Sequence, residues 1–144
     1  MNSTKQFFKN NTMAISIGIV YLWFGLLKFF PELSPAEGLA KNTIHELTFG
    51  LIPSNITIIL LAILETGTGL FLILNLYRRI TVKIGLAHIL FTFTPLFLFP
   101  EQVFNNSPFE LTLLGQYIAK NLIIICALIA LLNESKKSKL LTTV

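Results

Sequence analysis

The sequence has few charged residues. Asp, Glu, Lys and Arg make up only 12% of its 144 residues, whereas 53% are hydrophobic. Soluble domains carry about twice that charged fraction, roughly 25%. This composition, with a mean hydropathy of +0.73, argues against a soluble globular enzyme, a disordered chain and a nucleic-acid-binding protein. It favours a protein of the lipid bilayer.

Cysteine and histidine are also scarce. One cysteine, Cys126, excludes a disulfide framework, a CxxC redox pair and a cysteine-based zinc site. The two histidines leave little for any other metal site, and His45 lies outside the apolar stretches, which argues against bis-histidine haem. We therefore expect neither a metal nor a covalently bound cofactor.

Four apolar stretches are long enough to cross a hydrocarbon core, which takes about 20 helical residues. They are residues 12–30, 56–77, 80–99 and 113–132. Backbone groups cannot stay unpaired in lipid, and the alternation of a β-barrel strand is absent, so the stretches should be helices. Residues 28–32, KFFPE, follow the apolar core of the first stretch where a signal peptidase would need small residues, so this helix should stay uncleaved. The prediction is an all-α, integral membrane four-helix bundle forming a single domain, 1–144.

Basic residues predict the orientation. Of the eleven, eight fall in the N-terminus, in the turn between the second and third stretches, and in the tail 133–144: Lys5, Lys9, Arg78, Arg79, Lys83, Lys136, Lys137 and Lys139. The other two loops hold only Lys41 and carry several glutamates. Because basic loops stay on the cytoplasmic side, we expect both termini in the cytoplasm and a multi-pass protein of the cell inner (plasma) membrane.

The first outer loop predicts a short amphipathic helix at about residues 35–47. Ser34 is placed as its N-cap, with Pro35 at the first helical position and Glu37 at the third. Leucine, alanine and isoleucine then recur at helical spacing, which is typical of a helix lying on the membrane surface.

Ionisable groups inside the spans are the candidate site. Glu65 and His88 lie near the middle of the second and third spans, Lys120 lies about one turn outward in the fourth, and Lys28 lies at the outer end of the first. A charge at the bilayer centre costs about 2.5–3.5 kcal/mol, so such groups face inward and pair. Similar depth and opposite charge predict a Glu65–Lys120 ion pair, with His88 beside it.

Polar and small residues accompany these groups on the same helix faces. In the first span one face carries Gly18, Tyr21, Gly25 and Lys28; in the second Ala62, Glu65, Thr66 and Gly69; in the fourth Gln116 and Lys120, with Asn121 adjacent. Small residues let membrane helices approach closely. The predicted cluster of Glu65, Lys120 and His88 therefore has Tyr21 or Lys28 at its outer mouth.

Two interpretations of the cluster stay open. It lines a pocket for a polar head group, or relays protons to one, since a carboxylate beside a histidine can exchange protons near neutral pH. Alternatively, Glu65 and Lys120 form a structural pair that holds two helices in register, His88 is a packing residue, and Lys28 snorkels to the interface.

The sequence resembles the DoxX-like family of small four-helix membrane proteins. The resemblance rests on GIVYLWFGLLKF at residues 18–29, LETGTGLFL at 64–72 followed by Arg78 or Arg79, and KNL at 120–122. The matching positions are Gly25, Lys28, Glu65, Gly69, Lys120 and Asn121. The resemblance implies a bundle with polar residues clustered between helices, and named members include a subunit of a thiosulfate:quinone oxidoreductase.

Three functions compete. The first is a membrane redox subunit that binds a quinone at the cluster while a partner subunit supplies electrons. The second is a small-molecule or proton-coupled carrier, which at this size needs a homo-oligomer. The third is a non-catalytic assembly or scaffold protein. Whether the protein is an enzyme stays open.

Overall fold

The computed structural model describes residues 2–30, 33–34, 36–105 and 109–141. Within these residues the fold is all-α, as predicted. Its elements, in chain order, are α1 (Asn2–Leu27), α2 (Glu37–Leu47), α3 (Ser54–Ile73), α4 (Arg78–Phe91), α5 (Pro95–Leu98), α6 (Pro100–Val103) and α7 (Leu113–Leu141).

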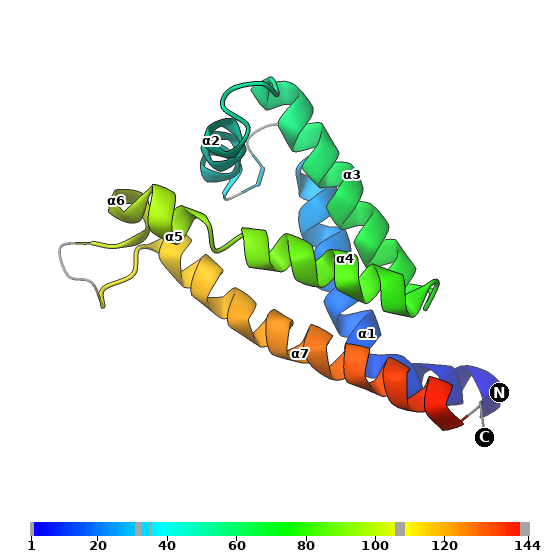
Figure 1. Ribbon diagram of the computed structural model, residues 1–144. Coiled ribbons are helices and arrows are strands. Elements are labelled where there is room, and N and C mark those ends of the chain that lie inside the picture. The colour runs from blue at the N-terminus through cyan, green and yellow to red at the C-terminus, as the bar shows by residue number, and fades with distance from the viewer. Residues whose placement is uncertain (1, 31–32, 35, 106–108, 142–144) are drawn as a thin grey trace.

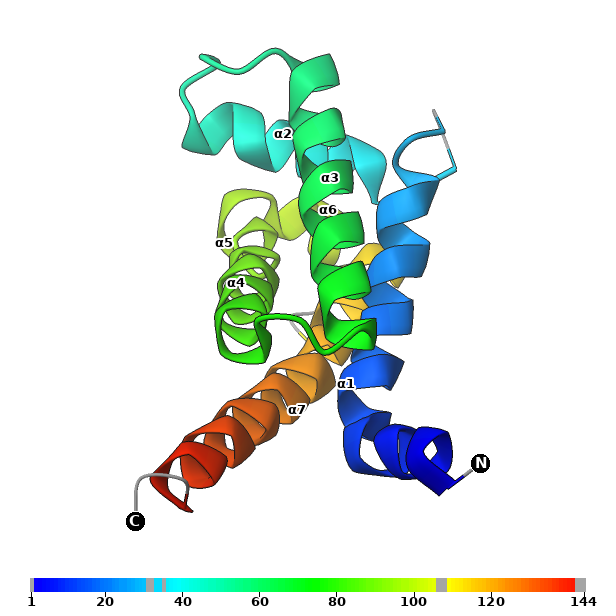
Figure 2. The same cartoon turned by 90° about the vertical axis from the view of Figure 1, so that its right-hand side faces the viewer.

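The long helices are arranged as two packed pairs. α1 lies along α3, and α4 lies along α7, with contacts between α3 and α4 and between α1 and α7 joining the pairs. Figures 1 and 2 show α2 at one end of the molecule, and the start of α1 and the end of α7 at the other. α7 crosses the α1–α3 pair at an angle, and its first half leads away from them (Figure 1). The four helices therefore splay apart more than those of the compact bundle that we expected.

The α1–α3 pair is held at backbone contact by glycines. A side chain at Gly18 would lie 2.8 Å from the Gly69 carbonyl oxygen, and one at Gly25 would lie 2.6 Å from the Thr66 nitrogen. At Gly69 it would overlap the backbone of Leu22. Membrane helices associate by such close packing, because lipid offers no hydrophobic drive between them. The small-residue faces predicted from the sequence are thus the faces in contact.

The second helix ends earlier than predicted. α3 stops at Ile73, not at residue 77, because the chain turns through Asn75 and Tyr77, both of which have positive φ. The Thr81 hydroxyl donates to the Leu76 carbonyl at 3.0 Å and fastens this turn. α4 can then begin directly at Arg78, two residues before the predicted start.

The third apolar stretch is not one continuous helix. α4 ends at Phe91, and α5 begins at Pro95 after a short turn. Proline lacks an N–H group and clashes with the carbonyl four residues earlier, so the helix cannot run through to residue 99. The hydroxyls of Thr92 and Thr94 donate to the carbonyls of Ile89 and Phe91 at 2.6 and 2.7 Å, which satisfies backbone groups that the break leaves.

The outer helix is present, but its cap differs from the prediction. α2 begins at Glu37, with Ala36 and not Ser34 in the N-cap position and no side-chain cap, and the Ser34 carbonyl accepts from the Glu37 nitrogen at 3.2 Å. Pro35 lies outside the described residues. Leu39 of α2 packs with Val103 and Ile118 in a small core that links α2, α6 and α7. This core fixes α2 beside the ends of the long helices.

Several helices have the length and composition of membrane spans. Within the described residues they are α3 (20 residues), the segment Arg78–Leu98 (21 residues) and Leu113–Ser135 of α7 (23 residues). The apolar part of α1, Asn11–Leu27, is shorter. A multi-span helical membrane protein accounts for the many large apolar side chains on its surface, including Trp23 and Ile123.

Two glycines on α3 offer a matched test of the helix contact. Gly69→Ala should destabilise the protein by about 1–3 kcal/mol, because the new methyl group meets the Leu22 backbone, which cannot yield. Gly67→Ala meets nothing within 4 Å and should be neutral, or stabilising by up to about 1 kcal/mol. Thermal unfolding in mild detergent measures both, and equal midpoints would contradict the backbone contact.

Candidate functional site

The candidate site is a carboxylate shared by three helices. Glu65 lies in the middle of α3 with its side chain only 9% exposed, and it meets Lys28 from the end of α1 and His88 from α4. The side chains of Lys28 and His88 are 11% and 12% exposed. Burial of this kind at a helix junction is expected of ionisable residues inside spans, which need partners there.

Lys28, not Lys120, forms the ion pair with Glu65. The Lys28 Nζ donates to Glu65 Oε2 at 2.6 Å. The contact follows from the helix packing: Gly25 rests on the backbone of Glu65 and Thr66, so Lys28, about one turn later, is carried next to the carboxylate. The predicted Glu65–Lys120 pair is therefore wrong, and so is the prediction of a snorkelling Lys28.

Lys120 and Gln116 lie on the outward face of α7. Both are exposed, and the Lys120 Nζ stands 5.7 Å from the centre of the Tyr117 ring, within the range of a cation–π contact. The Gln116 amide has a long contact of 3.5 Å to the Leu111 carbonyl. Similar depth in the bilayer thus failed as a guide to pairing, because α7 turns this face away from α3.

His88 completes the cluster, as predicted. Its Nε2 lies 3.2 Å from Glu65 Oε1, and its Nδ1 lies 3.4 Å from the Tyr21 hydroxyl oxygen. The rings of Tyr21 and His88 meet edge to face, with centroids 5.6 Å apart. Each carboxylate oxygen of Glu65 therefore has its own nitrogen partner, one from α1 and one from α4.

The hydrogen bonds of the cluster indicate which atoms of Tyr21 and His88 carry protons. Tyr21 donates its single hydrogen to the Gly85 carbonyl at 2.8 Å, so its oxygen faces His88 as an acceptor. An ionised carboxylate also only accepts, which places a proton on His88 Nε2. A second proton on Nδ1 would find the Tyr21 oxygen as its acceptor, whereas an unprotonated Nδ1 would face that oxygen without a donor.

Asn121 belongs to a different contact. Its amide donates to the Thr92 hydroxyl at 2.9 Å and ties α7 to the end of α4, just before the break at Pro95. The resemblance implied that Asn121 shares a polar cluster with Glu65. In the structure it is instead a link between helices.

Sequence reasoning missed a second polar network at the other end of the molecule. Arg78 donates to Asn11 Oδ1 at 2.9 Å and to Glu134 Oε2 at 2.8 Å, which joins α4 to α1 and α7. Arg78 was considered as a basic residue of a loop and as part of the DoxX-like resemblance, but not as a partner of other polar residues. The nearby Asn11 and Glu134 gave no periodic signal, because they fall near the ends of apolar stretches.

Neither a metal centre nor a relative adds to this geometry. Among the described residues, no three His, Cys, Asp or Glu side chains gather into a group that could hold a metal ion. Comparisons with protein-family models, with curated proteins and with solved structures found no match to this chain. The candidate site is therefore defined by the side-chain contacts described above.

Two lysine variants separate the pairing that we observe from the one that we expected. Lys28→Met should destabilise the protein by about 2 kcal/mol, because it leaves the buried carboxylate of Glu65 short of one partner. Lys120→Met, which leaves Glu65 untouched, should be close to neutral. The double variant Lys28→Met/Glu65→Gln should recover part of the loss, since it removes the orphaned charge.

Chemical unfolding of the four proteins in detergent micelles measures these differences. A larger loss from Lys120→Met than from Lys28→Met would contradict the site described here.

Proposed function

We propose that the protein is a quinone-interacting subunit of a membrane redox system, and that the cluster of Glu65, His88, Lys28 and Tyr21 receives the quinone head group. The observation that carries the proposal is Glu65, a carboxylate inside a span whose two oxygens are held by Lys28 at 2.6 Å and His88 at 3.2 Å. Ionisable residues within spans mark ligand sites and proton relays more often than plain packing. The DoxX-like resemblance also supports a quinone-interacting subunit.

The cluster suits the proton chemistry of quinones. Reduction of a quinone to a quinol takes up two electrons and two protons, one at each carbonyl oxygen. His88 has an acceptor on both of its nitrogens, so it can hold a proton and pass it to an oxygen placed against the cluster. Lys28 supplies a cation that favours the developing negative charge on that oxygen. Glu65 orients both groups.

A partner subunit would supply the electrons. We place its contact on the outward face of α7, where Gln116 and Lys120 are exposed within an apolar helix. Polar side chains in spans are rarely left facing lipid, so a protein surface is the better neighbour. A carrier working as a homo-oligomer would use the same face, and a scaffold protein would need the face but not the cluster.

Ligand-induced stabilisation tests the proposal. A head-group benzoquinone at about 100 times its Kd should stabilise the purified wild-type protein by about 2.7 kcal/mol. Glu65→Gln should lose this stabilisation, because the amide no longer holds both Lys28 and His88 in place. Lys120→Met should keep it, since Lys120 lies outside the cluster.

Each protein is compared with its own ligand-free form, so a lower starting stability does not affect the result. The absence of any shift with benzoquinones or naphthoquinones in the wild type would overturn the proposal. An equal shift in Glu65→Gln would move the binding site away from the cluster.

A further inference from the structure

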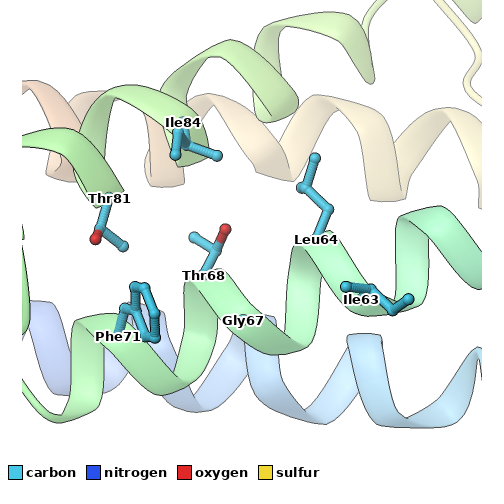
Figure 3. A pocket seen from close by; sticks show the side chains of 7 residues that line it. All are labelled: Ile63, Leu64, Gly67, Thr68, Phe71, Thr81 and Ile84. Carbon is cyan, nitrogen blue, oxygen red and sulfur yellow. The ribbon is translucent and has the colours of Figure 1, made fainter.

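An apolar groove lies between α3 and α4, and residues of both helices line it. Figure 3 shows its lining side chains, with Leu64, Thr68 and Phe71 rising from α3 and Thr81 and Ile84 descending from α4. Its volume is about 290 Å³ and its lining is almost wholly apolar. Ligand pockets usually start at about 300 Å³, so the groove has the size for part of a ligand, such as a chain, without its head group.

Gly67 keeps the groove open. A Cβ placed on Gly67 would meet nothing within 4 Å, although this residue lies in the middle of a packed helix and lines the groove. Glycine destabilises the interior of an α-helix relative to alanine. The helix contact explains the glycines at positions 18, 25 and 69, but no neighbour requires one at position 67.

The groove lies close to the polar cluster. Thr68, which lines the groove, lies one helical turn from Glu65 on the same face of α3. Its methyl group lies 3.4 Å, and the Tyr21 hydroxyl 3.6 Å, from the point where a side chain on Gly85 would begin. Gly85 thus stands between groove and cluster and adds no side chain there.

We propose that this groove binds the isoprenoid chain of the quinone whose head group lies at the cluster. The inference rests on the proposed function and names the ligand class more closely: a quinone with a hydrocarbon chain, not a small water-soluble quinone. The groove is apolar, and Thr68 in its wall lies one helical turn from Glu65, at the site for the head group. A phospholipid acyl chain is the competing occupant, and the experiment distinguishes it.

The test compares two probes on three proteins. The probes are 2,3-dimethoxy-5-methyl-benzoquinone and the same head group with a ten-carbon chain. The proteins are the wild type, Gly67→Phe, which fills the groove without a clash at its Cβ, and Gly38→Phe. Gly38 is the matched control, because its Cβ also meets nothing within 4 Å but lies on α2, away from the groove.

We expect the wild type and Gly38→Phe to bind the chain-bearing probe about fivefold more tightly than the head group alone, through packing in the groove. Gly67→Phe should bind both probes equally, with its affinity for the head group unchanged. Partitioning of the longer probe into detergent is the same for all three proteins, so the comparison cancels it.

The other outcomes each have one meaning. If Gly67→Phe keeps the fivefold preference, the groove does not hold the chain, and the proposed function survives. If Gly67→Phe loses a co-purified phospholipid in native mass spectrometry but keeps the preference, the occupant is a lipid chain. If neither probe binds to the wild type, both the proposed function and this inference are overturned.

Discussion

A carboxylate in a hydrocarbon layer must be neutralised, and the position of Glu65 sets this requirement for the whole fold. Its partners come from both directions along the chain: Lys28 precedes it, directly after α1, and His88 follows it on α4. One side chain thus joins α3, α4 and the end of α1. In lipid, contact between apolar surfaces of helices brings no hydrophobic stabilisation. Polar contacts of this kind and close packing therefore stabilise the association of the helices.

The ion pair depends on the glycine contact between α1 and α3. Gly18, Gly25 and Gly69 let the two backbones touch, and this contact carries Lys28 to within 2.6 Å of Glu65. A larger residue at any of these positions would separate the helices and draw the lysine away. Packing and electrostatics therefore act as one unit here, and a change at Gly25 should affect the site even though glycine has no polar side chain.

The sequence predicted the parts of the fold that follow from local rules. Hydropathy identified the long helices, and the spacing of small residues identified the faces of α1 and α3 that meet. The residues at which helices end were harder to predict. Pro95 indicates that α4 stops early, but the apolar composition of residues 80–99 led us to predict one continuous helix. The turn through Asn75 and Tyr77 was also missed, because both residues have positive φ and neither is a glycine.

The membership of the cluster was predicted in part: Lys120, Gln116 and Asn121 were expected near it, but they make other contacts. Glu65, His88 and Tyr21 were expected together, and they are. The choice between Lys28 and Lys120 could not be made from depth alone, because it depends on the direction in which α7 crosses the other helices. The Gly85 carbonyl, which holds Tyr21, carries no sequence signal, since every residue has such a group.

The central claim, that Lys28 neutralises Glu65, is most directly tested by solid-state NMR in lipid bilayers. Among the residues that the structure describes, dipolar recoupling between ¹⁵N-labelled lysine Nζ and ¹³C-labelled glutamate side-chain carboxyl carbons should show two close pairs, Lys28–Glu65 and Lys41–Glu37. We predict that one correlation disappears in Lys28→Met and that both persist in Lys120→Met. Loss of the Glu65 correlation in Lys120→Met, with both retained in Lys28→Met, would contradict this account.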